Sequence, residues 1–244
     1  MSQSRRDRQS AHQRALAEQQ AAQRRRERRV LAGGVIAVVL VLIAAGIGFQ
    51  AWRTHRAPSA GTVTPGPAVP VTITDGQPVS WGSAGAPLTV DRYEDFHCPH
   101  CADFEEDYGQ LLADAQAAGT IRLRIFPMSF IDAGSAAAAN GFACAAETGF
   151  GAAFYTGLFA NQNLDWSDSQ LNQLAERASG TVPAEFSTCV SERRHAGWAD
   201  SIDAAAAAAG VAGTPAMIID GRAVDITTLT PDSLTTTIEE AAQK

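Results

Sequence analysis

The sequence predicts an α/β domain with an inserted helical subdomain, preceded by one transmembrane helix. Three observations predict this arrangement: an unbroken apolar run near the N-terminus, a strand, helix and strand around a C-x-x-C motif, and a long alanine-rich region that ends in a hairpin and a last helix. The predicted parts are a basic cytoplasmic tail at 1–29, a transmembrane helix at 30–50, a linker at 51–70 and the folded domain at 71–244, with the helical insertion at about 132–209.

The apolar run from Val30 to Phe49 is long enough to cross a membrane. It contains no charged residue, and at ~1.5 Å per residue a helix of this length spans a hydrocarbon layer of ~30 Å. Residues 1–29 carry nine arginines against three acids, so the positive-inside rule places the N-terminus in the cytoplasm. The alternative is a cleaved signal peptide, against which stand the long basic leader and the poor cleavage site at Pro58-Ser59-Ala60. Both interpretations place the following domain outside the cytoplasm.

Charge divides the chain at the same place. Residues 1–56 hold 11 basic and 3 acidic residues, whereas residues 57–244 hold 8 basic and 23 acidic residues, a net charge of −15. A domain this acidic has no electrostatic basis for binding nucleic acid, so that class of partner is excluded. The basic leader is interpreted as a disordered tail that sets the topology, with contact to anionic lipid as the alternative.

The folded domain begins with the elements of a β-α-β unit. A strand is expected from Leu88 to Phe96 and a helix from Ala102 to Ala118, which Gly119 ends. Residues 121–126 then alternate apolar and charged side chains, as a strand does. Because such crossovers are right-handed, the two strands should lie parallel. The segments before them are expected to be a short strand at 71–74, a turn at 75–76 and a loop at 78–86.

A long helical region separates this unit from the end of the domain. Its breaks predict four helices, the third capped by Asp168 or Ser167. The expected helices are 136–148, 150–160, 167–178 and 185–209. Five aromatic residues in this region, Phe142, Phe150, Phe154, Tyr155 and Phe159, are interpreted as packing rather than as a binding site. A hairpin at 216–224 and a last helix at 231–243, capped by Thr230, complete the prediction.

The C-x-x-C motif of Cys98 and Cys101 carries the chemistry. Cys98 follows the predicted strand and stands at the start of the predicted helix, where free amide donors and the helix dipole stabilise negative charge. The pKa of a thiol at this position should lie below the ordinary value of about 8.5. The thiolate is the reactive form, and Cys101, one turn further along, can resolve a mixed disulfide formed at Cys98. A thiol–disulfide exchange catalyst requires this arrangement.

All four cysteines, Cys98, Cys101, Cys144 and Cys189, lie on the exported side. An even number in an oxidising compartment indicates two disulfides, and four cysteines allow three pairings. The C-x-x-C spacing favours Cys98 with Cys101, which leaves Cys144 with Cys189. The second pair is interpreted as a structural disulfide, with a second redox relay as the alternative.

Two segments resemble the thioredoxin-fold thiol oxidoreductases, and within them the DsbA-like group of the membrane-anchored actinobacterial type. They are the run from Tyr93 to Cys101 and the tripeptide Gly213-Thr214-Pro215 before a strand and an Asp-Gly turn. The resemblance covers about residues 70–243 and implies a thioredoxin fold with a catalytic Cys98–Cys101 pair. It also implies a cis Thr214–Pro215 bond facing that pair, with the Thr214 backbone placed to bind an extended substrate peptide.

The resemblance also indicates residues that tune the thiol. Pro99-His100 is the dipeptide of strongly oxidising members, in which the imidazole stabilises the thiolate. Where the family often places a buried acid, six residues before the first cysteine, this chain has Arg92. A guanidinium facing the site would lower the thiol pKa further, whereas one pointing away would be a surface charge. The proton-transfer role is therefore unassigned, and Asp95 and Glu94 are the nearest substitutes for the acid.

Partners follow from the same resemblance. Reduced exported proteins are the expected substrates, and a quinone-linked membrane protein of the DsbB type or the vitamin K epoxide reductase-like type is the expected reoxidant. The sequence contains no cofactor motif. A second disulfide within the insertion also occurs in DsbA-like proteins of actinobacteria, in agreement with Cys144 and Cys189.

Other functions are weighed against a disulfide-donating oxidase. A structural zinc site needs four ligands, and Cys98 and Cys101 have no second ligand pair at a suitable spacing, so no metal is expected. A non-catalytic binding module would require the C-x-x-C disulfide to be permanent. A disulfide isomerase usually has a dimerisation domain before the catalytic one, and a reductase has a less oxidising dipeptide. The isomerase, the reductase and the binding module stay as alternatives.

Overall fold

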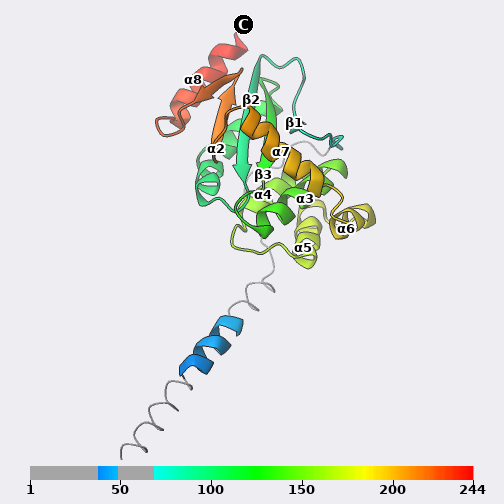
Figure 1. The fold of residues 1–244 in the computed structure, drawn as a ribbon. Coiled ribbons are helices and arrows are strands. Elements are labelled where there is room, and N and C mark those ends of the chain that lie inside the picture. Colours follow the sequence, from blue (N-terminus) through cyan, green and yellow to red (C-terminus); the bar gives the residue numbers. More distant parts are fainter. Residues whose placement is uncertain (1–37, 49–68, 244) are drawn as a thin grey trace, which may run out of the picture. The chain divides into compact units, whose positions relative to one another are not determined.

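The computed structural model describes residues 38–48 and 69–243 (Figure 1). The chain divides into two units, Met1–Trp52 and Arg53–Lys244. In the first unit, residues 38–48 form a helix with exposed side chains. Among the residues described, no helix combines the length and the apolar character needed to cross a membrane. The predicted tail at 1–29 lies outside the described residues, as do residues 30–37 and 49–50 of the predicted transmembrane helix and most of the predicted linker, and these assignments stay predictions.

The second unit is built on a mixed sheet with the strand order β1-β3-β2-β4-β5. The strands are β1 (Val79–Trp81), β2 (Leu88–Asp95), β3 (Ile121–Met128), β4 (Ala216–Ile219) and β5 (Arg222–Val224). Strands β2 and β3 pair in parallel, and the other neighbours pair antiparallel. Helix α2 (Pro99–Ala117) joins β2 to β3. The predicted β-α-β unit and the predicted hairpin are therefore confirmed.

The first strand lies later in the chain than predicted. The expected strand at 71–74 is irregular, and β1 forms within the segment that we expected to be a loop. Val71 donates its amide to the carbonyl of Ala146 at 2.9 Å, which ties the segment to a helix end instead of the sheet. Strand β1 buries Val79 and Trp81 against β3. With three residues it is too short to show the alternation that identifies a strand.

The helical region contains five helices where the sequence predicts four. They are α3 (Ala133–Glu147), α4 (Gly151–Phe159), α5 (Asp168–Ser179), α6 (Ala184–Ser191) and α7 (Ala196–Ala208). Of the two predicted caps for α5, Asp168 and Ser167, the structure shows Ser167, which forms a capping box. Thr230 caps the final helix α8 (Pro231–Ala242) with a capping box, as predicted. The expected aromatic packing is confirmed by ring contacts such as Tyr155 with Phe159, whose centroids lie 5.1 Å apart.

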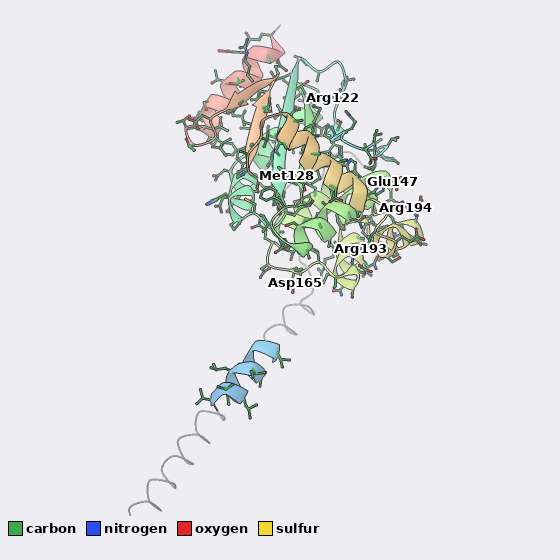
Figure 2. All side chains as sticks on the ribbon, in the orientation of Figure 1. Arg122, Met128, Glu147, Asp165, Arg193 and Arg194 are labelled. Carbon is green, nitrogen blue, oxygen red and sulfur yellow. A yellow bond between two sulfur atoms is a disulfide. The ribbon has the colours of Figure 1, made fainter. Side chains whose placement is uncertain are left out.

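The predicted helix at 185–209 is wrong because the chain turns between α6 and α7. Arg193 adopts a positive φ of 53° and the amide of Arg194 binds the carbonyl of Cys189 at 3.1 Å. His195 then lies 3.1 Å from Glu147 through Nε2 and Oε2. Figure 2 shows Arg194 and Glu147 close together at this corner. The turn at 192–195 contains no glycine or proline, so no local signal marks the break between the two helices.

The helices pack around the sheet in Figure 1. Helices α3 and α7 contact β3, so α7, the last helix of the predicted insertion, lies against the sheet. Helix α2 contacts β3 and α8, and α8 contacts β2. The central strand β2 is buried along nearly its whole length. The loop after its C-terminal end leads into α2 and contacts the start of α3 and the residues before β4.

Candidate active site

The C-x-x-C motif forms the turn between β2 and α2. The amide of Cys98 binds the carbonyl of Asp95 at 2.9 Å, and Cys98 is the N-cap residue of α2, with Pro99 in the first turn. Both thiols are free, so the structure represents the dithiol form. Cys98 is 6% exposed and Cys101 is fully buried. The predicted position of Cys98 at a helix N-terminus, where backbone donors lack partners within the helix, is confirmed.

The cis-proline lies beside the first thiol. The Thr214–Pro215 peptide bond is cis, as predicted. The Cys98 thiol donates to the carbonyl oxygen of Thr214 across 3.5 Å. Strand β4 starts at Ala216, directly after Pro215, and pairs antiparallel with β2. Two segments far apart in sequence are thus joined at the reactive sulfur, and the Thr214 backbone lies where the resemblance places it.

Asp95 anchors the turn instead of contacting a thiol with its carboxylate. The carboxylate accepts hydrogen bonds from the amide of His97 at 2.8 Å, the hydroxyl of Ser135 at 2.7 Å and the amide of Ile131 at 3.3 Å. Burial raises the pKa of Asp95, and these three donors partly offset the effect. Because all three donors belong to the turn or to the segment that leads into α3, Asp95 ties the motif to the helical region.

Two more side chains restrain the same turn. His97 places Nδ1 2.8 Å from Asp132, the N-cap residue of α3. Burial would raise the pKa of Asp132, but the hydrogen bond with His97 lowers it overall. Gln162 donates its side-chain amide to the carbonyl of Cys98 at 2.6 Å. Two segments of the helical region, residues 131–135 and the loop of Gln162, therefore hold the turn.

Gly134 in α3 is expected not to tolerate alanine. A Cβ at this position would lie 2.1 Å from Cε1 of His97, whose ring is buried and held by Asp132. Such overpacking costs about 1–3 kcal/mol, and each kcal/mol lowers the melting temperature of a domain this size by roughly 2–4 °C. Thermal unfolding of Gly134→Ala, followed by circular dichroism, measures the loss.

Gly197 in α7 supplies the matched control for this substitution. A Cβ there meets nothing within 4 Å, so Gly197→Ala should stabilise the protein by about 0.4–1 kcal/mol through the unfolded state. Equal melting temperatures for Gly134→Ala and the wild type would show that the His97 ring is free to move aside.

His100 points to solvent in the dithiol form. Its side chain is 84% exposed, and its Nδ1 lies 3.6 Å from the carboxylate of Asp103. The expected contact between this imidazole and Cys98 is not found among the described residues. The tuning role of Pro99-His100 stays a prediction.

The second thiol lies beside a buried carboxyl group. Burial raises the pKa of Cys101 well above its ordinary value, and the charge of Glu94 raises it further. Burial also raises the pKa of Glu94 to about 7, with Arg92 opposing the shift. Cys101 is thus a poor leaving group as an anion, and Glu94 is a carboxyl group that can carry a proton near neutral pH. Of the two acids considered from the sequence, Glu94 has the required properties.

Arg92 is buried, which excludes the alternative of a surface charge, and its effect on the Cys98 thiol stays a prediction. Its side chain is 2% exposed and forms ion pairs with Glu94 and with Glu105, the second at 2.8 Å. Burial alone would lower the pKa of Arg92, but the negative charge of Glu94 and its neighbours raises it. The guanidinium also lies over the ring of Phe104, 4.7 Å from its centroid. The position where the family often has a buried acid is thus occupied by a buried guanidinium, and this guanidinium is paired with two carboxyl groups.

Sequence reasoning did not identify Glu105 and Tyr155 as parts of this cluster. Tyr155 was interpreted as a packing residue, which describes its ring but not its hydroxyl group. Glu105 carried a weak signal, because it follows Cys101 by four residues and so lies on the same face of a helix.

The second cysteine pair is bridged as predicted. Cys144 in α3 and Cys189 in α6 form a disulfide with Cα atoms 5.9 Å apart. Both residues are fully buried. His195 lies close to the two sulfur atoms, but their bond to each other leaves them without the thiolate form that binds metal ions.

The mixed sheet, the dithiol at a helix N-terminus and the cis-proline beside it define a thioredoxin-fold dithiol protein. A family model described as Thioredoxin matches residues 74–240. The chain belongs to this family.

Solved structures of DsbA-like proteins have the same fold. The reduced disulfide bond oxidoreductase DsbG of Mycobacterium tuberculosis is 22% identical with a TM-score of 0.61, covering 70% of this chain and 90% of that one. Oxidised BdbD of Bacillus subtilis is 20% identical with a TM-score of 0.60, covering 78% and 100%. MdbA of Actinomyces oris, a thiol-disulfide oxidoreductase, is 23% identical with a TM-score of 0.58, covering 68% and 90%. The predicted DsbA-like thioredoxin fold is confirmed.

A curated relative matches over part of its length. The Na(+)/H(+) antiporter NhaA 3 of Salinispora tropica is 32% identical over 142 residues, which are 58% of this chain and 21% of that protein. The chain therefore spans about a fifth of the length of this relative.

Proposed function

We propose that the protein is an extracytoplasmic thiol:disulfide oxidoreductase that donates its Cys98–Cys101 disulfide to reduced exported proteins. The observation that carries the proposal is the position of the Cys98 sulfur, at the N-cap of α2 and 3.5 Å from the Thr214 carbonyl. A client thiolate can approach this sulfur along the exposed face of Pro99 and His100. The fully buried Cys101 is protected from the client.

The proposed reaction moves two electrons from the client to the enzyme. A client thiolate attacks Cys98, the Cys98–Cys101 bond breaks, and Cys101 leaves with the electron pair and takes up one proton. Glu94 supplies that proton, because a sulfur with so high a pKa leaves readily only when it is protonated. The second client thiolate then attacks the client sulfur of the mixed disulfide, and Cys98 leaves as a thiolate, which the helix N-terminus stabilises.

Reoxidation and location complete the proposal. The dithiol must return two electrons to an oxidant, and a quinone-linked membrane protein of the DsbB type or the vitamin K epoxide reductase-like type would accept them. A single membrane span at 30–50 would keep the enzyme close to such a partner. The apolar run without charge and the arginine-rich residues 1–29 support this topology.

Oxidative refolding tests the function. The oxidised full chain is mixed with a reduced protein that needs several disulfides, and client activity and free thiols are followed over time. We expect faster oxidation than with the same concentration of glutathione disulfide. An equal rate would exclude the oxidase, and efficient rescue of a client with scrambled disulfides would favour the isomerase.

A further inference from the structure

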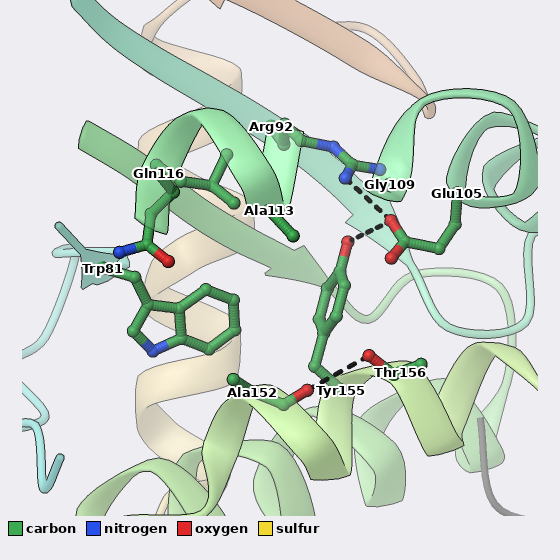
Figure 3. A pocket seen from close by; sticks show the side chains of 10 residues that line it. Trp81, Arg92, Glu105, Gly109, Ala113, Gln116, Ala152, Tyr155 and Thr156 are labelled. Atoms are coloured by element: carbon green, nitrogen blue, oxygen red, sulfur yellow. Dashed lines mark hydrogen bonds and ion pairs between the residues drawn. The ribbon is translucent and has the colours of Figure 1, made fainter. Parts of the chain in front are cut away.

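Four buried polar side chains from three elements contact one another, and the charge of one of them, Glu94, acts on the Cys101 thiol. Arg92 and Glu94 come from β2, Glu105 from α2 and Tyr155 from α4. The Tyr155 hydroxyl is hydrogen-bonded to Glu94 and lies 3.1 Å from Oε2 of Glu105. Figure 3 shows the Tyr155 hydroxyl and the Arg92 guanidinium converging on the Glu105 carboxylate. We call these four residues the carboxyl cluster.

The hydrogen bonds of the carboxyl cluster form a path for a proton. The Tyr155 hydroxyl donates to Glu94, and its oxygen also lies 3.1 Å from Oε2 of Glu105. A tyrosine hydroxyl has one hydrogen and an oxygen that accepts, so when its hydrogen moves to Glu94 its oxygen can take a proton from Glu105. Burial raises the pKa of Glu94 to about 7, so Glu94 can hold a transferred proton near neutral pH.

The two ends of this path face different surroundings. At the inner end, the charge of Glu94 acts on the buried Cys101 sulfur. At the outer end, Glu105 lines a surface pocket of ≈ 390 Å³ between α2 and α4. Glu106, Gln110 and Ala160 on the walls of this pocket are exposed. A second cavity of ≈ 30 Å³ also borders Glu105 and Tyr155, enough for one water molecule.

We propose that Tyr155 and Glu105 form a proton relay that connects water in the surface pocket to Glu94 and so to the departing Cys101 sulfur. When the disulfide opens, the Glu94 proton moves to Cys101 and the Tyr155 proton moves to Glu94, while Glu105 takes a proton from water in the pocket and passes it to Tyr155. One proton therefore enters from solvent for each sulfur that leaves, and Tyr155, Glu94 and Glu105 return to their starting states. The relay rests on the proposed function, and its residues act through Glu94 without touching the sulfur.

The environment of Glu94 sets the pH range in which the relay matters. The charged and titratable groups facing Glu94 are Arg92 on its own strand, Cys101 and Glu105 on α2, and Tyr155 on α4. Below about pH 7, Glu94 already holds a proton and can deliver it without help. Above that pH, Glu94 is ionised, and each proton for Cys101 must come from solvent through Tyr155.

Tyr155→Phe interrupts the relay while keeping the packed ring. Single-turnover oxidation of a dithiol peptide by the full chain is measured between about pH 6 and about pH 8.5, and the rate of the variant is divided by that of the wild type. The ratio should be near one at the low end and fall about tenfold at the high end. Because the ionisation of the peptide thiols changes the rates of the variant and the wild type equally, it cancels in the ratio of the two rates. Tyr108→Phe is the matched control, since its hydroxyl binds the Leu229 carbonyl outside the carboxyl cluster.

A second variant tests the outer end of the relay. Glu105→Gln removes the proton acceptor and should give the same loss confined to high pH, whereas Glu106→Gln on the wall of the same pocket should not. A ratio near one at every pH for both relay variants overturns the proposal. A ratio lowered equally at every pH also overturns it, because it indicates a purely structural role. A wild-type chain that fails to oxidise the peptide refutes the proposed function instead.

Discussion

Cys98→Ser is expected to abolish disulfide transfer, and Cys101→Ser is expected to trap the client on the enzyme. Without Cys98 the only remaining thiol of the motif is fully buried and cannot be reached by a client thiolate. Loss of a catalytic nucleophile should lower the rate at least about a thousandfold. The client for Cys101→Ser is supplied in its disulfide form, so that the Cys98 thiolate attacks the client disulfide, forms a mixed disulfide and releases one client thiol. Without Cys101 no internal thiol of the enzyme resolves this mixed disulfide, which should accumulate. Non-reducing electrophoresis and mass spectrometry detect the trapped complex.

The two variants also check each other. The Cys98→Ser variant should form no mixed disulfide with the same client, which excludes trapping at another cysteine. Substantial transfer by Cys98→Ser would show that the exchange takes place elsewhere in the chain. In the wild type, iodoacetamide should modify Cys98 much faster than Cys101, because Cys101 is buried and burial raises its pKa.

Removing the second disulfide is expected to lower stability and leave activity nearly unchanged. The bridge joins Cys144 and Cys189 across 45 positions, and loop-closure entropy assigns such a bridge a stabilisation of about 4 kcal/mol. For a domain of this size the loss corresponds to a fall in melting temperature of roughly 8–16 °C. Calorimetry of the Cys144→Ala, Cys189→Ala double variant measures it. Client oxidation is assayed well below the new melting temperature.

This experiment also separates the structural disulfide from the alternative of a second redox relay. A structural bridge predicts a large change in unfolding with little change in turnover. Lost turnover at unchanged stability would instead assign the bridge a part in electron transfer. Both sulfurs are buried between α3 and α6, which agrees with the structural role.

The parts of the site that the sequence predicts are those with a local chemical signal. The two cysteines of the motif, Thr214-Pro215 before a strand, and a helix that follows the motif are all visible in short stretches of sequence, and the structure brings them together. The strands on each side of α2 also carry enough alternation to be located. The order of these elements then determines the parallel pairing of β2 with β3.

The parts that the sequence does not predict depend on contacts between distant segments. The surroundings of Arg92 come from Glu105, 13 positions away, and the hydroxyl of Tyr155 reaches Glu94 across 61 positions. Nothing local distinguishes Arg92 from a surface arginine or Tyr155 from a packing tyrosine, and Glu105 has only the weak signal of its spacing from Cys101. The short strand β1 and the corner at Arg193 were missed for a related reason, because tertiary contacts rather than residue preferences determine both.

The anchoring of the C-x-x-C turn by Asp95, His97 and Gln162 has a consequence for the energetics of turnover. Because these contacts hold the backbone around the motif in the dithiol form, we expect the main chain to keep this conformation when the disulfide closes. Opening and closing the disulfide then requires the displacement of two sulfur atoms and little reorganisation of the main chain. The difference in folding free energy between the oxidised and reduced proteins should therefore report the chemistry of the sulfur atoms directly.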